Sequence, residues 1–480
     1  MTSETLELIE RDDAGNITTT YIESAASEGR SRVDAVLPKA SKSYAQQLLD
    51  VFLPVGYPHS DSLQAFSSSI AGLLSSRAVL EARTPGYRLL PHVRTFRSRR
   101  ISKPLARKPD HPCLGKRPVE GVGVGDASAS PTAALLLSVL QESMGRIATI
   151  LFAHRLGTSL EPECKMYRLA ADVFNDTAMV LDCLSPAFPK SARVLILSFS
   201  SVLRSLCGVC AGSSKASLSA HFARRGNLGE LNAKDSSQET VISLLGMLAG
   251  SFVVSWVSTP MATWTMLVAL LSTHLATNYA AVKSVSMRSL NRQRANILLS
   301  KLLQDGRILS PPEVSTRERI FERDGVLRWT DDSILGHCRI GVSLENLISQ
   351  TGQRHRRSGS LHMQAIKLSD IVRLYQDEGY LLWSCGSNAM IVLKQDCTPT
   401  DQLKAWTQAL LLARRRTQDS KPKDGEHDTS GALLAELRSA LEEAQKLFNT
   451  YESQLRDAGW DLDVAVLETR PGVRIQIETK

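Results

Sequence analysis

The chain has 480 residues, a formal net charge of +8 and 43% hydrophobic residues, with a mean hydropathy of −0.11. This hydropathy is ordinary for a soluble protein, so a membrane-embedded part must be confined to a few segments. The eight cysteines are scattered, which excludes a small disulfide framework and favours a reducing compartment. A chain of this length can bury a sizeable core and should hold two or three domains.

Residues 1–42 are a polar lead-in with one expected strand at 17–22. The first fifteen residues are acidic and contain no apolar stretch, so we expect neither a secretory signal nor a transit peptide.

Helical patterning begins near residue 43 and continues to about 305, except for residues 82–120. This stretch holds eleven Lys and Arg against two acidic residues and is rich in Pro, and it alone makes the chain cationic. It predicts a disordered basic insert. The aromatic residues that single-strand binders use are nearly absent from it, so no nucleic-acid partner is expected.

Ser130-Pro131 predicts the start of a helix, because serine is a good N-cap and proline suits the first helical position. Further on, the chain is almost wholly apolar over 241–257 and again over 261–282, around a break at Ser258-Thr259-Pro260. Each arm approaches the ~20 residues that cross a bilayer. Basic residues flank both outer ends, which indicates a helical hairpin that enters a membrane from the cytoplasm. A capping box at 236–239 predicts that the first arm starts there.

After residue 309 the pattern changes to short strands, expected at 337–344, 380–384, 389–395, 464–468 and 474–478. The second and third should pair across Cys385–Asn388. Capping boxes at 310–313 and 398–401 predict helix starts, and a further helix is expected at 432–455. We therefore predict a mainly α fold, a helical membrane-associated bundle followed by a smaller α+β C-terminal domain. The predicted segments are 1–42, 43–305, 306–416, a linker at 417–430, and a C-terminal helix with strands at 431–480.

Several long strings resemble the root UVB sensitive family, in the order in which that family carries them. They are FLPVGYPHS (52–60), DSLQAFSSSIAGLLSSRAVLE (61–81), GVGDASASPTAALLL (123–137), RLAADVFNDTAM (168–179), HFARRGNLGELNAKDSSQET (221–240) and HLATNYAAV (274–282). The resemblance implies a fungal-type member with links to vitamin B6 status, similar to integral membrane proteins and without an accepted catalytic mechanism. Plant members of the family look like plastid proteins, an address that this N-terminus does not support.

The chain departs from the family pattern twice. An aromatic-rich stretch between PHS and DSLQAF is missing, and residues 82–120 interrupt a junction that the family crosses almost directly. Our hypothesis is a mis-spliced gene prediction, with intron translated at one junction and an exon dropped at the other. A transcript that contains the codons for Arg94 to Lys116 would contradict it.

The strongest polar cluster lies just before the first apolar arm. Its members are His221, Arg224, Arg225, Asn227, Lys234, Asp235, Gln238 and Glu239. Cations beside a helix N-terminus can hold a phosphate or carboxylate, and this defines a candidate ligand site. A positive-inside flank with an ordinary capping box explains the same residues, and we prefer that interpretation.

Polar residues inside apolar helices form a second set of candidates. His274 and Asn278 share a helix face, which either lines a bundle interior or cavity or hydrogen-bonds to a neighbouring helix. Arg204 interrupts another apolar segment. Asp172 and Asp176 place two carboxylates on one helix face, where hydrogen bonding is preferred to metal binding because no further ligands can be assigned. Gly208/Gly212 and Gly246/Gly250 have the spacing that lets helices approach closely.

No motif of a known catalytic machinery is present, so an enzyme is the less favoured interpretation, and no cofactor or metal is expected. The first hypothesis is a membrane-associated carrier, scaffold or regulator in small-molecule homeostasis, with both termini facing the cytoplasm. Its expected partners are membrane lipids, an anionic small molecule, and a family paralogue or a second copy of the chain. The alternative is a soluble helical enzyme that acts on an anionic metabolite and whose apolar hairpin is its core.

Overall fold

The structure is a computed structural model that describes residues 6–12, 15–25, 31–37, 131–223, 226–256, 259–354, 361–363, 366–418, 429–470 and 472–479. The predicted basic insert at 82–120, the family strings before residue 123 and Arg224 and Arg225 lie outside these residues. The chain divides into two compact units. The first comprises residues 1–47, 154–170 and 210–480, and the second residues 48–153 and 171–209.

The first unit is built on one sheet. The described strands are β1 (Leu6–Arg11), β2 (Ile17–Ala25), β3 (Ser31–Val36), β4 (Val326–Arg328), β5 (Ile334–Ile340), β6 (Gly352–Arg354), β7 (Leu361–Met363), β8 (Tyr380–Cys385), β9 (Asn388–Lys394) and β10 (Arg474–Thr479). They follow the order β4-β5-β9-β10-β1-β2-β3-β7-β6, and β8 pairs with β9. The predicted β8–β9 hairpin is confirmed, with Cys385 opposite Asn388. No strand forms at 464–468, where the chain runs without regular structure.

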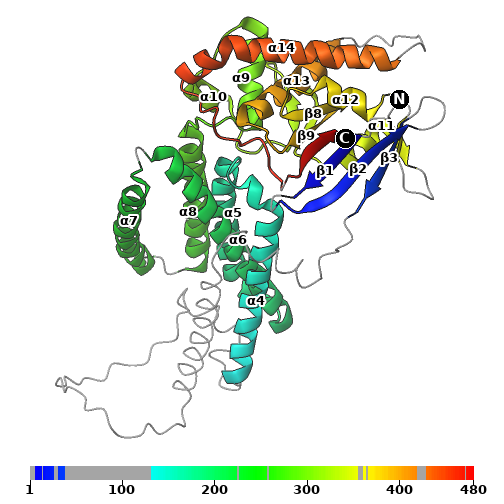
Figure 1. Ribbon diagram of the computed structural model, residues 1–480. Helices are drawn as coiled ribbons and strands as arrows, with labels where there is room; N and C mark the ends of the chain where they lie inside the picture. Colours follow the sequence, from blue (N-terminus) through cyan, green and yellow to red (C-terminus); the bar gives the residue numbers. More distant parts are fainter. Residues whose placement is uncertain are drawn as a thin grey trace, which may run out of the picture. The chain divides into compact units, whose positions relative to one another are not determined.

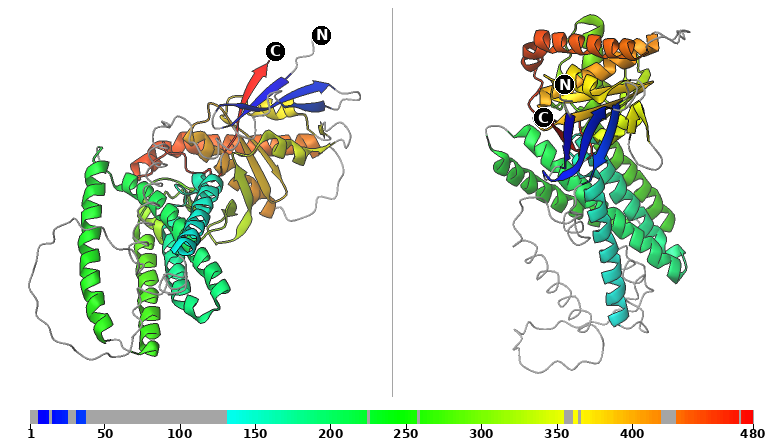
Figure 2. Two further views of the ribbon diagram at one scale, coloured as in Figure 1. Left: turned by 90° about the horizontal axis from the view of Figure 1, so that it is seen from below. Right: turned by 45° about the vertical axis from the view of Figure 1, so that its right-hand side comes forward.

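Residues of the predicted polar lead-in supply the middle of this sheet, and the strand expected at 17–22 is confirmed as part of β2. Strand β1 pairs antiparallel with β2 on one side and with β10 on the other, so the two ends of the chain lie side by side (Figures 1 and 2). Leu8 stands opposite Tyr21 and Ile477, and Leu8 and Tyr21 are buried in the main core. Because side chains alternate along a strand, the neighbours of Leu8 on β1 and of Tyr21 on β2 face the opposite side of the sheet.

Two buried glutamates fasten these strands to helices. Glu10 on β1 accepts the main-chain N–H of Leu344, which begins α11 (Leu344–Thr351), at 2.8 Å. Glu23 on β2 accepts the N–H groups of Leu368 and Ser369, which begin α12 (Leu368–Leu374), at 3.2 and 2.9 Å. Carboxylates suit these positions because the first N–H groups of a helix have no partner within the helix and carry a partial positive charge.

Helices α9 (Arg292–Asp305), α10 (Pro311–Arg317), α13 (Pro399–Gln418) and α14 (Thr429–Asp457) complete the core. Helix α13 packs against β5, β8 and β9, and Figure 1 shows α14 lying over it. Trp406 of α13 is fully buried, and its indole N–H donates to Asn296 at 2.8 Å. The capping boxes predicted at 310–313 and 398–401 are confirmed by their hydrogen bonds.

The apolar hairpin belongs to the first unit and consists of α7 (Leu228–Trp256) and α8 (Pro260–Ser284). Thr259 caps α8 with Pro260 at its first position, as the break in the sequence indicates. The predicted start of α7 at 236 is wrong, because the helix begins at Leu228 and the residues of the expected capping box lie inside it. A Lys234–Glu230 pair one turn apart supports this earlier start.

The second unit contains parts of α4 (Pro131–Leu156), α5 (Cys164–Leu184) and α6 (Lys190–Phe222). Ser200 donates to the main-chain oxygen of Ala178, and Ser201 donates to that of Gln141, which ties α6 to α5 and to α4. Short 3₁₀ turns at Gly157–Ser159 and Ser185–Ala187 connect the helices. The predicted class, mainly helical with a smaller sheet-containing C-terminal region, is confirmed.

Candidate functional site

Three described helices are long and apolar enough to cross a membrane. By length and composition they are Leu135–Ser159, Ala192–Phe222 and Met261–Ser284. The second predicted arm of the hairpin is therefore among them, and the first arm is not. Helix α7 carries only sixteen apolar-rich residues after its charged first half, from Val241 to Trp256.

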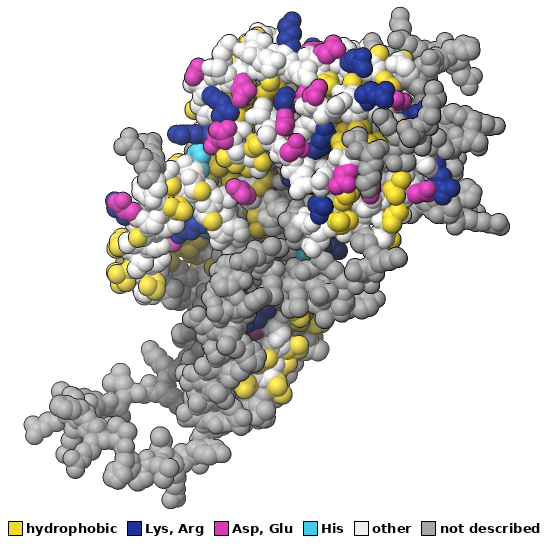
Figure 3. Space-filling view, viewed as in Figure 1, with side chains coloured by type: hydrophobic (Ala, Val, Ile, Leu, Met, Phe, Trp, Pro, Cys, Tyr) yellow, Lys and Arg dark blue, Asp and Glu magenta, His cyan; other side chains and the backbone are white. Residues whose placement is uncertain are grey.

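The apolar side chains of the hairpin are exposed rather than buried. Eight large hydrophobic residues between Val241 and Trp256 are 54% to 76% exposed. Figure 3 shows hydrophobic side chains gathered on α7 at the left of the view. On α8, Met261 is 77% exposed and Leu270 57%. Exposed apolar surface of this kind marks a site that contacts lipid or another protein.

The predicted polar cluster is only partly brought together among the described residues. Lys215 of α6 forms ion pairs with Asp235 at 2.7 Å and with Glu239 at 3.0 Å. Lys234 is 71% exposed and pairs with Glu230 on its own helix. Asn227 lies just before α7, and its main-chain oxygen accepts from Leu231. The two acidic members, Asp235 and Glu239, thus bind Lys215, which lies outside the predicted cluster.

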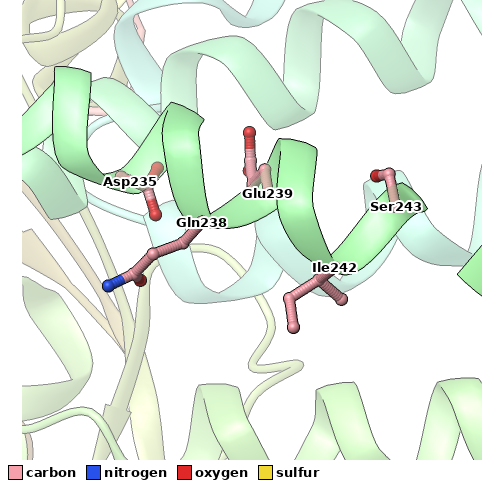
Figure 4. A pocket seen from close by; sticks show the side chains of 5 residues that line it. All are labelled: Asp235, Gln238, Glu239, Ile242 and Ser243. Atoms are coloured by element: carbon pink, nitrogen blue, oxygen red, sulfur yellow. The ribbon is translucent and has the colours of Figure 1, made fainter. Parts of the chain in front are cut away.

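An open hollow of about 480 Å³ lies beside the same part of α7. Its described lining is Asp235, Gln238, Glu239, Ile242 and Ser243, which follow one another along the helix in Figure 4. Four of these five lining side chains are polar, and Ile242 is the apolar one. This described lining contains no cation, so it does not by itself attract an anion.

The polar residues predicted within apolar helices have partners. His274 and Asn278 hydrogen-bond along α8, with 2.8 Å between the ring Nε2 and the amide Nδ2. In the second unit, Arg204 forms an ion pair with Asp182, which offsets its charge in an apolar helix. Asp172 and Asp176 of α5 are 9% and 5% exposed. Within the described residues no group of three or more His, Cys, Asp or Glu could hold a metal ion.

A buried ion network in the first unit was not predicted from the sequence. Glu318, 4% exposed, receives Lys165 of α5 at 2.5 Å and Arg294 of α9 at 2.8 Å on its two carboxylate oxygens. Lys165 also donates to Ser315 at 3.2 Å. The amine of Lys283, at the end of α8, donates to the main-chain oxygen of Glu318. We call Lys165, Lys283, Arg294 and Glu318 the Glu318 cluster.

A second set of ion pairs lies close by. Arg292 of α9 contacts Glu163 at 3.0 Å and Asp324, and it also donates to Thr469 at 2.9 Å. Asn291 donates to the main-chain oxygen of Pro162 at 3.1 Å. Lys165 and Glu318 are separated by 153 residues, so no local pattern pairs them. The only sequence signal is a set of charged residues at the ends of apolar helices, which is also the signal of a membrane flank.

Burial dominates the electrostatics of the Glu318 cluster. Burial lowers the pKa of Lys165 below its ordinary value, while Glu318 opposes this shift and the neighbouring Arg294 adds to it. Buried lysines keep their charge only when carboxylates or other acceptors stabilise it.

Two family models match the chain. The model described as "Vitamin B6 photo-protection and homoeostasis domain" matches residues 38–306, and the one described as "Root UVB sensitive protein, C-terminal" matches residues 307–470.

Curated relatives agree with these matches. The chain is 31% identical over 381 residues to "Protein root UVB sensitive 3" of Arabidopsis thaliana, covering 77% of this chain and 75% of that protein. It is 32% identical over 341 residues to "RUS family member 1" of Dictyostelium discoideum, covering 68% of this chain and 55% of that protein. It is 23% identical over 447 residues to "Protein root UVB sensitive 2, chloroplastic" of Arabidopsis thaliana, covering 90% and 85%. No solved structure matches the chain.

Proposed function

The chain belongs to the root UVB sensitive family, and from this premise we propose that it is a membrane-associated protein of small-molecule homeostasis. Vitamin B6 is the small molecule that the description of its larger matched domain names. The protein acts as a carrier, scaffold or regulator rather than as an enzyme.

The observation that carries the proposal is the exposed apolar surface of α7 and α8. Side chains such as Leu248, Phe252 and Trp256 are 62%, 65% and 76% exposed. In water this surface would be costly at about 25 cal/mol per Å² of apolar area. Lipid removes the cost, because hydrocarbon is as apolar as these side chains. The basic residues at both outer ends of the hairpin support termini that face the cytoplasm.

The ligand in this proposal is an anionic small molecule held at the edge of the membrane. Arg224, Arg225 and Lys234 attract the anion, and Glu239 helps to orient it. His274 and Asn278 provide a polar face on α8 inside the membrane. Their mutual hydrogen bond supports this role, since polar groups at membrane depth persist when they have partners.

A helix partner is also part of the proposal, either a family paralogue or a second copy of the chain. Built Cβ atoms at Gly246 and Gly250 of α7 would meet no atom within 4 Å. Glycines four residues apart form a flat face on which another membrane helix can pack closely.

Alkaline carbonate extraction of cell membranes tests the membrane part of the proposal. We expect the protein to remain in the membrane pellet. Release into the supernatant as a folded particle would support the soluble enzyme instead.

A complementation assay tests the ligand part. We expect Arg224→Ala with Arg225→Ala to abolish rescue of a deletion strain while protein abundance stays the same. Cellular pyridoxal phosphate, measured by chromatography, should then match the deletion strain. Lys301→Ala is the matched control and should rescue normally, because the half-buried Lys301 pairs with the exposed Asp305 on α9. Full rescue by the double variant would count against the site.

A further inference from the structure

Two candidate spans end beside each other in the first unit. The candidate span on α6 ends at Phe222 and the one on α8 at Ser284. The side chain of His221 lies against the main chain of Ser286, which brings the two ends together. The Glu318 cluster lies next to these helix ends, because its member Lys283 is in the last turn of α8 and contacts Glu318.

Cations outnumber carboxylates in the Glu318 cluster. Lys165 and Arg294 are 5% and 2% exposed, and they share a single carboxylate, that of Glu318. Among the described residues, the amine of Lys283 donates to the main-chain oxygen of Glu318, not to its carboxylate. Three positive charges therefore meet one negative charge.

The nearby carboxylates are committed to another cation. Glu163 and Asp324 both contact Arg292. Lys283 is half-buried and Arg288 is exposed, so a solvent-borne ligand can reach both side chains. His221 lies in the electric field of Arg288, Arg294 and Lys165.

Surplus buried charge is costly unless a counter-charge joins it. The lowered pKa of Lys165 agrees with this strain, with burial as its largest cause. An anion at the open side of the cluster would relieve it. Lysine and arginine at a helix end are the groups that hold phosphate in proteins.

We propose that the Glu318 cluster, together with His221 and Arg288, binds the phosphate group of an anionic ligand at the shared end of α6 and α8. This inference rests on the proposed function in one respect, namely that a membrane lies beside these helix ends. The phosphate belongs either to a lipid headgroup or to a soluble phosphorylated metabolite, and both present the same chemistry to the cluster.

Thermal-shift and equilibrium binding assays on the full chain in detergent test the site. The probes are inorganic phosphate, pyridoxal phosphate against pyridoxal, and mixed micelles of phosphatidic acid against phosphatidylcholine. We expect each phosphate-bearing probe that the site accepts to bind at least about tenfold more weakly to Lys283→Gln with Arg288→Gln. Arg32→Gln, at an exposed pair with Asp34 on β3, is the matched control and should bind as the wild type does. Preference for pyridoxal phosphate or for phosphatidic acid identifies the source of the phosphate.

Glu318→Ala gives an independent readout. This variant removes the resident carboxylate and leaves room for a replacement anion beside Lys165 and Arg294. We expect phosphate to raise its melting temperature more than that of the wild type, and more than chloride does at equal ionic strength. If this variant does not fold, the binding assay with Lys283→Gln and Arg288→Gln decides.

The outcomes separate this inference from the proposed function. Unchanged binding in the Lys283/Arg288 variant with lost binding in Arg224→Ala/Arg225→Ala would overturn the inference and leave the proposed function standing. Absence of binding to every phosphate probe would also overturn it. Release by carbonate would overturn the membrane proposal. The phosphate-binding assay in detergent does not depend on that result and would still test the Glu318 cluster.

Discussion

Glu10 offers the sharpest test of how the N-terminal strands are held in the first unit. Its carboxylate is 4% exposed and accepts the N–H of Leu344 at 2.8 Å and the hydroxyl of Thr18 at 3.3 Å. Glu10→Ala leaves the N–H of Leu344 buried without this charged acceptor. A hydrogen bond to a charged group contributes about 1.5–3 kcal/mol, so the free energy of unfolding should fall by about that amount.

The conservative variant Glu10→Gln separates hydrogen bonding from charge. It keeps an acceptor for Leu344 and should cost less than alanine. Burial raises the pKa of Glu10 above its ordinary value of 4.5, against the opposing hydrogen bond from Leu344. The folded state therefore holds this proton more tightly than the unfolded state does. Its contribution to stability is fully present below the unfolded pKa and is lost as pH rises through the folded pKa.

Chemical denaturation followed by circular dichroism between pH 4 and pH 7 measures both effects. Because glutamine does not titrate, the stability of Glu10→Gln relative to the wild type should improve as pH rises over this range. A constant difference between the two proteins across the range would refute the assigned pKa direction. An alanine variant as stable as the wild type would refute the role of Glu10 at the start of α11.

Three further outcomes test other parts of the structure. Gly145→Ala should destabilise the second unit, because the added Cβ would overlap Ser205 of α6. At Gly208 an added Cβ meets no atom within 4 Å, so Gly208→Ala should raise stability by up to about 1 kcal/mol through helix propensity. The reverse order in thermal unfolding would contradict this packing. Deletion of residues 1–36 should make the protein aggregate, because it exposes the edge of β10, and light scattering of a monodisperse truncated protein would argue against the sheet order. Trp406→Phe should lower stability by about 1–3 kcal/mol, because Asn296 loses its buried donor, and denaturation midpoints equal to the wild type would refute that contact.

Local chemistry made much of the fold predictable. Proline and a capping residue mark the starts of α8, α10 and α13, because proline fixes the backbone and the cap accepts an N–H within the same few residues. The β8–β9 hairpin is legible for the same reason, since its two apolar runs are adjacent in the chain. The start of α7 was missed because the pattern at 236–239 also fits the interior of a helix that is supported by Lys215 of α6.

Long-range pairings could not be predicted. Strand β1 reads as polar because Glu7 and Glu10 interrupt its apolar residues. The partner that stabilises the buried Glu10 lies 334 residues away. The Glu318 cluster could not be predicted for the same reason, since Lys165 and Arg294 meet the carboxylate of Glu318 only in the folded chain. Candidate residues such as His274 and Asn278 were legible because their hydrogen bond spans a single helical turn.

The depth of α8 in the membrane tests the central claim most directly. A cysteine introduced by Leu270→Cys can be labelled with a membrane-impermeant maleimide in sealed native vesicles and read by peptide mass spectrometry, with the exposed native Cys385 as the internal control. We predict that Cys385 reacts promptly in sealed vesicles whose cytoplasmic side faces the reagent, while the introduced thiol reacts only after detergent is added. Equal and rapid labelling of both thiols before detergent is added would contradict a membrane-embedded α8.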